Sequence, residues 1–203
     1  MTALFADTFY WIALTDFRDS AHERAVTLTF QRTDVPIVTT DEVIVEFLTF
    51  FATAPEQMRR KALGNARRIL DSPSVRVVPQ SRASLLAGMT LYEARPDKEY
   101  SLTDCISMQT MRREGITEAL TNDRHFEQEG FRALFRDTRG AWTAKGNVSN
   151  CLTRLLSPES CGFGTPRNLW NLLRDLHNRN QFSVHPDGPP IWQESSSGRQ
   201  DRY

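Results

Sequence analysis

Short apolar segments alternate with helix-like segments along residues 1–137, and this alternation constrains the fold more than any other feature of the chain. The predicted strands are residues 4–6, 36–38, 75–78, 119–121 and 133–135. The predicted helices are residues 8–14, 22–30, 41–51, 55–70, 83–92 and 102–114, with a short helix near residue 125. Strands that alternate with helices in this way are typical of βαβ units around a parallel sheet. The sequence therefore predicts an alternating, doubly wound α/β domain over residues 1–137.

Residues 138–203 have a different character. They carry scattered Gly, Asn, Ser and Pro residues and no convincing strand. One helix is predicted from Thr165, which can cap it, because Pro166 suits the first helical position and positions 169, 172, 173 and 176 are leucines at helical spacing. The segment after residue 180 reads as turn and disorder. We therefore expect a poorly ordered or partly helical C-terminal extension over residues 138–203.

Four acidic residues follow the apolar segments or lie on the helices next to them. Asp7 follows residues 4–6, and Glu46 lies on the helix after residues 36–38. Asp104 opens the helix at 102–114, and Asp123 follows residues 119–121. Because the carboxyl ends of neighbouring parallel strands face one crevice, we expect these carboxylates to meet there. Carboxylate oxygens suit Mg²⁺ or Mn²⁺, and crowded carboxylates raise the pKa of at least one of them when no metal is bound.

Helix capping is the competing interpretation for three of these acids. Asp is a preferred N-cap residue, so Asp7 and Asp123 could cap the helices that follow them. Ser101 and Asp104 are three residues apart and fit a capping box. Residue chemistry alone leaves the capping and metal-binding interpretations open for all three.

The sequence distinguishes more clearly between the expected roles of Glu42 and Glu46. These residues are four apart and lie on one helical face. The segment 39–42 fits a capping box, which assigns Glu42 to capping. Glu46 lies among apolar residues, where a buried carboxylate needs a cation or another partner. We therefore predict that Glu46 is the metal ligand of the two.

Formal charges cancel over the whole chain, with 25 basic and 25 acidic residues, but not within its parts. Residues 1–137 carry 17 basic and 20 acidic residues, and residues 138–203 carry 8 and 5. The front part is therefore not a basic domain that binds nucleic acid through phosphate attraction alone. If its acidic cluster meets a polyanion, a bound cation must first reverse the local field.

Three features point to a reducing cytoplasm. The three cysteines, Cys105, Cys151 and Cys161, are an odd number and do not suggest a disulfide framework. No run approaches the roughly 18 apolar residues that a membrane span needs. The first residues lack the basic and apolar regions of a signal peptide. We expect a cytoplasmic protein with no membrane partner.

The segments that carry the four acids resemble the PIN-domain family and, within it, the toxin ribonucleases of VapBC-type toxin–antitoxin pairs. Each segment alone is a weak signal, but the four occur in order and at separations like those of the family. The resemblance covers residues 1–136 and does not extend into the C-terminal extension. The matching segments are residues 5–14, 38–46, 100–105 and 119–126, followed by Gly130 and Phe131.

The resemblance implies an α/β/α sandwich with a central, mainly parallel sheet and an acidic pocket for Mg²⁺ or Mn²⁺. Residue by residue, Asp7 resembles the first metal ligand, Glu46 the helical acid, Asp104 the third acid and Asp123 the fourth. Two threonines beside them, at positions 8 and 121, would support the acids through their hydroxyl groups. The implied activity is metal-dependent hydrolysis of RNA phosphodiester bonds. The implied partners are an RNA substrate, a small antitoxin protein and, as a homodimer, a second copy of the chain.

Other residues have two interpretations each. Basic side chains on the predicted helix 55–70 could hold an RNA backbone, but a solvated helix face explains them as well; these are Arg59, Arg60, Lys61, Arg67 and Arg68. Three phenylalanines on one helix, Phe47, Phe50 and Phe51, are expected in the core, with a partner groove as the alternative. His125 is expected to pack or to cap rather than to act as a base.

Among function classes, the main alternative to the nuclease is a non-catalytic PIN-like module that binds RNA or protein. Two other enzyme classes fit poorly. A haloacid-dehalogenase phosphatase needs an acid two residues after Asp7, where the chain has Phe9. A dinucleotide-binding domain needs a glycine-rich turn after the first strand, and residues 8–11 are bulky.

Overall fold

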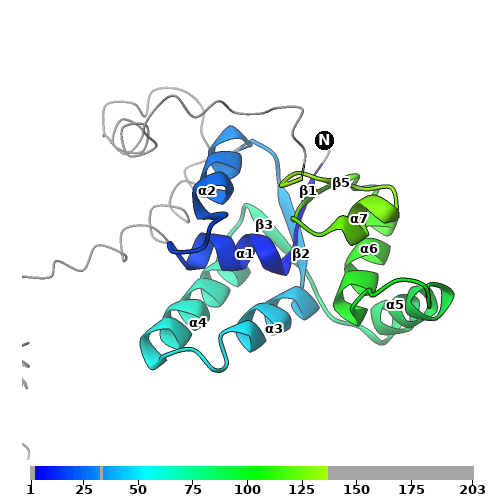
Figure 1. Ribbon diagram of the computed structural model, residues 1–203, viewed down its shortest axis with the longest axis horizontal. Coiled ribbons are helices and arrows are strands. Elements are labelled where there is room, and N and C mark those ends of the chain that lie inside the picture. The colour runs from blue at the N-terminus through cyan, green and yellow to red at the C-terminus, as the bar shows by residue number, and fades with distance from the viewer. Residues whose placement is uncertain (1–2, 33, 137–203) are drawn as a thin grey trace, which may run out of the picture.

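The computed structural model describes residues 3–32 and 34–136, and within them helices surround a five-stranded sheet (Figure 1). The strand order is β3-β2-β1-β4-β5, and all four neighbouring pairs are parallel. The elements are, in chain order, β1 (Leu4–Ala6), α1 (Thr8–Thr15), α2 (His22–Gln31), β2 (Ile37–Thr40), α3 (Asp41–Phe50), α4 (Glu56–Asp71), β3 (Val75–Val78), α5 (Arg82–Ala94), α6 (Leu102–Glu114), β4 (Glu118–Leu120), α7 (Arg124–Gln128) and β5 (Arg132–Ala133).

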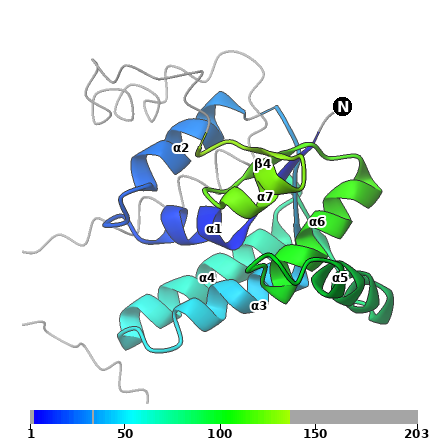
Figure 2. The ribbon, with the colours of Figure 1, turned by 45° about the vertical axis from the view of Figure 1, so that its right-hand side comes forward.

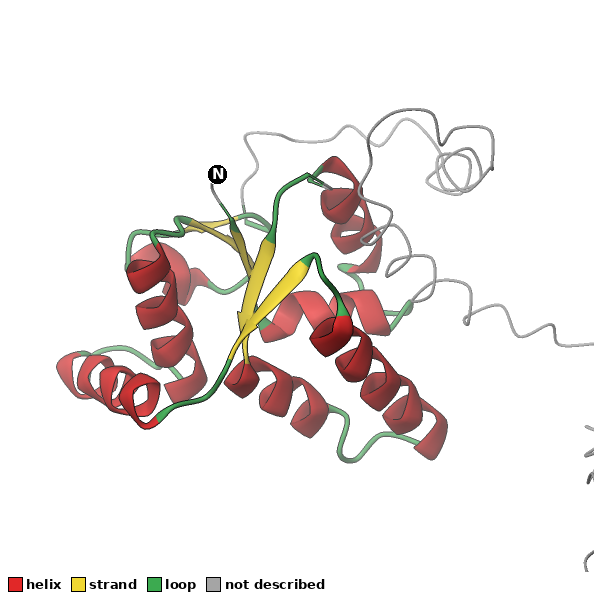
Figure 3. Ribbon diagram, turned by 180° about the vertical axis from the view of Figure 1, so that it is seen from behind, coloured by secondary structure: helices red, strands yellow, loops and turns green. Residues whose placement is uncertain are grey.

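Helices cover both sides of the sheet. Helices α1, α2 and α4 gather on one side and α5, α6 and α7 on the other, as views from the front and from behind both show (Figures 1 and 3). Helix α3 follows β2 and contacts α1, α4 and α6. The predicted α/β/α sandwich with a central parallel sheet is confirmed.

The predicted elements agree closely with those of the described residues. Each predicted strand is present, although the last one covers Arg132–Ala133 rather than residues 133–135. The helix predicted from Thr165 lies outside the described residues, as does the whole of the segment 138–203. The domain boundary at residue 137 therefore stays a prediction.

The central strands are apolar because both faces of the sheet are covered. In β1, Leu4, Phe5 and Ala6 are all buried, which is the pattern expected for a parallel sheet between helical layers. The largest fully buried side chains on the helices include Trp11 on α1 and Phe126 on α7. The rings of Phe5 and Phe126 are 6.4 Å apart between centroids. This packing fixes α7, and with it the loop that carries Asp123, against the central strand.

The three phenylalanines near the end of α3 do not share one environment. Phe47 and Phe51 are buried in the core, with their ring centroids 5.4 Å apart. Phe50 is 59% exposed, so its predicted place in the core is wrong. The reason is helical geometry, because residues 47 and 51 are one turn apart on one face and residue 50 projects from another.

Helices α5 and α6 are packed tightly at Gly88, which gives a stability prediction. A Cβ atom at Gly88 would lie 2.4 Å from Ile106 Cγ1, too close for any ordinary contact. We expect Gly88→Ala to lower the free energy of unfolding by about 1–3 kcal/mol in urea denaturation, because the two helices must separate. Gly64 on α4 is the control, since its Cβ would meet nothing within 4 Å. Gly64→Ala should stabilise the protein by roughly 0.5–1 kcal/mol, and equal urea midpoints for the two variants would contradict the close approach.

Candidate metal centre

The pairing of β1 with β4 brings Asp7 and Thr121 side by side. Ala6 is in register with Leu120, so the next residue of each strand leaves the sheet at the same edge. Thr121 Oγ1 donates a hydrogen bond of 2.8 Å to Asp7 Oδ2, and the backbone N–H of Asp123 donates to the same hydroxyl at 3.0 Å. The two residues lie at the carboxyl ends of β1 and β4, the two strands between which the chain switches from building one half of the sheet to building the other. Ligands commonly bind at this switch point in open α/β sheets.

Asp7 is buried among other acids. Its exposed fraction is 6%, and no side-chain bond caps α1, so the capping interpretation is wrong for this residue. Burial, followed by the negative charge of Asp104, raises the pKa of Asp7 from 3.8 to about 7, and the charge of Glu46 acts in the same direction. The bond from Thr121 opposes this rise without cancelling it. At neutral pH, therefore, Asp7 holds its full negative charge only if a cation is close.

Glu46 projects from α3 towards α1. Thr8 Oγ1 donates a hydrogen bond of 2.5 Å to Glu46 Oε2, which fixes one oxygen of the carboxylate. Burial raises the pKa of Glu46, and the negative charge of Asp104 adds to the rise, while the Thr8 bond opposes it. The two threonines that follow β1 and β4 thus hold one acid each.

The predicted capping role of Glu42 is wrong. The N-cap of α3 is Thr40, whose hydroxyl accepts from the backbone N–H of Val43 at 3.3 Å. Glu42 is buried and instead accepts a hydrogen bond of 3.3 Å from Ser84 on α5. Glu42 and Glu46 therefore serve different neighbours: the first bonds to α5 and the second to α1.

Asp104 and Asp123 do cap their helices. Asp104 Oδ2 accepts from the backbone N–H of Ser101 at 2.9 Å, and Ser101 Oγ accepts from the N–H of Asp104, which completes a capping box. Asp123 Oδ1 accepts from the N–H of His125 at 2.9 Å. A carboxylate offers about four lone-pair sites, so a cap bond to one oxygen leaves room for a cation. Capping and metal binding are compatible at both positions.

The charges of the four predicted acids act on one another. The Asp104 carboxylate raises the pKa of Asp7 and of Glu46, and the Asp123 carboxylate raises the pKa of Asp104, although burial is the larger cause in each case. Their elements meet at one end of the sheet, since α3 contacts α1 and α6, and α6 contacts α7 (Figure 2). Carboxylate oxygens that repel one another in a half-buried place are chemically suited to a divalent cation, so this end of the sheet is a candidate metal site.

His125 belongs to this cluster, which the sequence alone did not predict. Its ring nitrogen Nδ1 lies 3.0 Å from Asp123 Oδ2 and 3.8 Å from Asp104 Oδ2. One potential ligand atom from each of these three residues lies within 4.8 Å of the others. Asp7 and Glu46 are not in this group and are linked to it through the charge of Asp104. The prediction that His125 packs is correct as well, because its ring lies against that of Tyr100 with centroids 4.9 Å apart. The available signal was its position two residues after the fourth acid.

The buried Glu129 carboxylate connects the ends of α5, α6 and α7 next to the acidic cluster. The Glu129 side chain, after α7, is 3% exposed and binds Arg95 Nε at 2.7 Å and the guanidinium of Arg112. Tyr100, just before α6, also donates its hydroxyl to Glu129 at 3.2 Å. Because Tyr100 packs on His125, this ion-pair network links the ends of α5, α6 and α7 to the position of the histidine ring.

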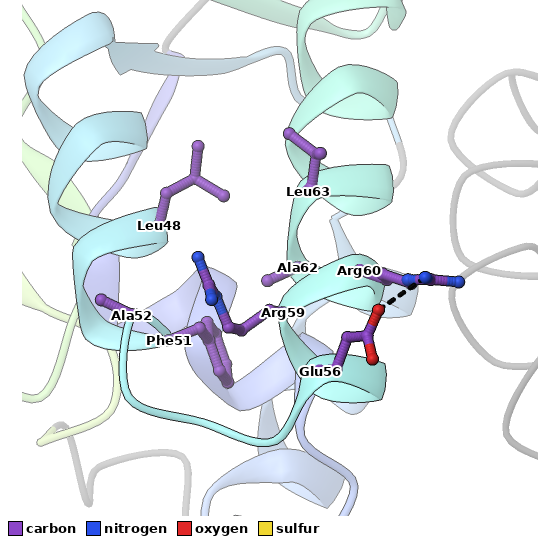
Figure 4. Close-up of a pocket in the computed structure, with 8 residues that line it drawn as sticks. All are labelled: Leu48, Phe51, Ala52, Glu56, Arg59, Arg60, Ala62 and Leu63. Atoms are coloured by element: carbon purple, nitrogen blue, oxygen red, sulfur yellow. Dashed lines mark hydrogen bonds and ion pairs between the residues drawn. The ribbon is translucent and has the colours of Figure 1, made fainter.

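A second surface is a groove between α3 and α4, and none of the four acids lines it (Figure 4). Its lining is mostly apolar, and Arg59 reaches from α4 towards α3. Arg60 turns to the outer side and pairs with Glu56 at 2.5 Å. The lining residues are Leu48, Phe51, Ala52, Glu56, Arg59, Arg60, Ala62 and Leu63.

Comparison with known proteins identifies the family. The family model described as the PIN domain matches residues 4–131, and this chain belongs to that family. Among solved structures, the chain is similar to the Mycobacterium tuberculosis toxin VapC20, described as cleaving the sarcin-ricin loop. The similarity has 27% sequence identity and a TM-score of 0.58, and covers 64% of this chain and 96% of that one. No curated protein matches the sequence. None of the helices within residues 3–32 and 34–136 combines the length and the hydropathy that a membrane span requires.

Proposed function

We propose that this chain is a metal-dependent endoribonuclease that hydrolyses RNA phosphodiester bonds and acts as the toxin of a type II toxin–antitoxin pair. The observation that carries this proposal is the buried Asp7 carboxylate, which accepts a hydrogen bond from Thr121 and lies close enough to Asp104 and Glu46 for their negative charges to raise its pKa. Without a cation, such a carboxylate cluster must either bind protons or hold charges that repel one another, and a bound divalent cation removes this repulsion. The similarity to an RNA-cleaving toxin of the same family supports RNA as the substrate.

In this proposal, Asp7, Glu46, Asp104 and Asp123 hold Mg²⁺ or Mn²⁺. A divalent ion in such a place supplies positive charge that lowers the pKa of a water molecule and stabilises negative charge at phosphorus. The protein's part is to hold the carboxylates: Thr121 fixes one oxygen of Asp7, and the cap bonds fix Asp104 and Asp123. Their orientation is set before the substrate arrives, which reduces the reorganisation needed in the reaction.

The reaction would not use a cysteine nucleophile. Cys105 lies next to Asp104, but its side chain is fully buried. Burial raises the pKa of its thiol to about 11, so the thiolate form is scarce at neutral pH. Direct attack by water on the phosphodiester, without a covalent enzyme intermediate, is the step we assign to this site. Such a nuclease would act on RNA in the cytoplasm.

The test is an RNA cleavage assay with the full chain. We expect cleavage with Mg²⁺ or Mn²⁺, loss of cleavage with EDTA, and recovery when excess metal is restored. The competing function is a non-catalytic binding module, which the cap bonds of Asp104 and Asp123 favour because they give both acids a structural role. Tight, metal-independent RNA binding without any cleavage would establish the binding module and overturn the nuclease.

The groove between α3 and α4 is our proposed docking site for the antitoxin. Its apolar lining and the guanidinium of Arg59 suit a helix with an apolar face and a carboxylate. Leu63 is 43% exposed at this groove. We expect Leu63→Glu to weaken binding of the cognate antitoxin by at least about tenfold, while RNA cleavage by the free toxin is unchanged.

Calorimetric titration of the purified partner into both proteins measures this effect, with Leu86→Glu on the outer face of α5 as a matched control. Leu86 is 50% exposed and does not line the groove. Equal affinity for the wild type and Leu63→Glu would remove the groove from the interface. A wild-type dimer that Leu63→Glu converts to a monomer would assign the groove to a second copy of the chain instead.

A further inference from the structure

The His125 side chain presents an imidazole nitrogen to the carboxylate cluster without a hydrogen bond to fix it elsewhere. Nδ1 is buried, and within the described residues it has no hydrogen-bond partner. It is 3.0 Å from Asp123 Oδ2, but the two atoms do not have the alignment of a hydrogen bond. A buried polar atom without a partner is unfavourable, so its presence needs an explanation.

The ring cannot easily turn this nitrogen towards solvent. Tyr100 packs against the imidazole with an interplanar angle of 58°, and its hydroxyl bonds to Gln128 and Glu129, each at 3.2 Å. The backbone N–H of His125 is held by Asp123 Oδ1. The Tyr100 ring thus packs against the imidazole, and the cap bond to Asp123 holds the backbone of His125. The imidazole is oriented before any ion enters.

We propose that His125 supplies a nitrogen ligand to the ion at Asp104 and Asp123, and that the site therefore prefers a transition-metal ion over Mg²⁺. This inference rests on the proposed function, because it names the class of metal for the same site. Imidazole nitrogen is a ligand of first-row transition metals, whereas Mg²⁺ takes oxygen ligands and keeps its waters. The side chains of His125, Asp104 and Asp123 are 14%, 13% and 33% exposed, so a small ion can reach all three.

The experiment is a binding measurement on the full chain without RNA, with Mn²⁺ as the probe and Mg²⁺ as competitor. Bound Mn²⁺ is followed by the loss of the free-ion electron paramagnetic resonance signal. In His125→Asn, which replaces the nitrogen with an amide of similar reach, we expect the preference for Mn²⁺ over Mg²⁺ to fall about tenfold or more, while Mg²⁺ affinity changes little. His22→Asn is the control, because His22 Nδ1 donates to the carbonyl oxygen of Ala13 on α1.

A spectroscopic measurement gives an independent answer. Protein labelled with ¹⁵N-histidine should show a nitrogen hyperfine coupling to bound Mn²⁺ that persists in His22→Asn and disappears in His125→Asn. Bound Mn²⁺ without nitrogen coupling, or an unchanged preference in His125→Asn, would overturn the inference while leaving the nuclease proposal intact. Nitrogen-coupled Mn²⁺ in a protein that cleaves no RNA would support the inference and overturn the nuclease. Absence of any Mn²⁺ binding would overturn both.

Discussion

Asp104→Asn is expected to lower metal-dependent RNA cleavage by at least about 100-fold without unfolding the protein. Asn is also a preferred residue at helix N-termini, and its side-chain oxygen can accept the N–H of Ser101 as Asp104 does. What the variant loses is the negative charge that acts on Asp7 and Glu46. Loss of a metal ligand should exceed the roughly 10–100-fold effect typical of residues that only support a ligand.

The matched control is Asp41→Asn. Asp41 Oδ2 accepts a hydrogen bond of 2.9 Å from the backbone N–H of Gln80, the same kind and length of bond that Asp104 makes. Asp41 also begins a helix, α3, but it is not grouped with Asp104, Asp123 and His125, and its charge does not contribute to the raised pKa of Asp7, Glu46 or Asp104. Initial rates with a labelled RNA, at several Mn²⁺ concentrations, compare the three proteins. Similar rates for Asp104→Asn and Asp41→Asn would show that Asp104 is only a cap.

Asp7→Asn should stabilise the metal-free protein at pH 8, by about 2–4 kcal/mol, although it removes a residue assigned to the site. One pKa unit corresponds to about 1.4 kcal/mol, and the pKa of Asp7 rises from 3.8 to about 7 on folding. Above pH 7 the folded wild type must hold a buried negative charge that Asn does not have. The Asn oxygen can still accept the hydroxyl of Thr121.

The pH dependence of this difference has a definite sign. Between pH 3.8 and about 7, Asp7 binds more protons in the folded state than in the unfolded state. The contribution of Asp7 to stability therefore decreases as the pH rises through this window and is lowest above pH 7. Thermal unfolding in EDTA should show an advantage of several degrees for Asp7→Asn at pH 8 that shrinks towards pH 5.

Adding Mn²⁺ should reverse the order of the two proteins. A ligand that binds only the folded state stabilises it in proportion to the logarithm of its concentration above the dissociation constant. The wild type is expected to gain stability from Mn²⁺, and Asp7→Asn to gain much less. A wild type that remains more stable than the variant in EDTA at pH 8 would contradict the burial of a repelled charge at Asp7.

The sequence predicts the sheet and the positions of the acids because both depend on local patterns. An apolar segment such as residues 4–6 predicts a buried strand, and the residue after it is therefore predicted at the carboxyl end of that strand. The predicted capping box at residues 39–42 fails for an equally local reason. The β-branched Thr39 and Thr40 continue β2 by two residues, so the helix begins at Asp41 and its cap is Thr40.

Other features depend on contacts between distant parts of the chain, which no local pattern reveals. From sequence alone Glu129 resembles any other surface acid. Its side chain is nevertheless 3% exposed, because it pairs with Arg95 and Arg112, which lie 34 and 17 residues earlier in the chain. The sequence predicts His125 as a packing or capping residue. In the structure its ring packs on Tyr100, and its Nδ1 atom lies 3.8 Å from Asp104 Oδ2. A cap bond uses one carboxylate oxygen. Whether the acid also binds an ion depends on where its other oxygen points, and the sequence does not give that orientation.

The most direct test of the central proposal is anomalous diffraction from crystals of the full chain grown with Mn²⁺. We expect an anomalous peak at the carboxyl end of β1 and β4, with carboxylate oxygens of Asp7 and Asp104 within coordination distance of the ion. Glu46 and Asp123 should face the same peak, directly or through water. Crystals that bind no Mn²⁺ among these four residues, while their side chains keep the same positions, would contradict the metal centre.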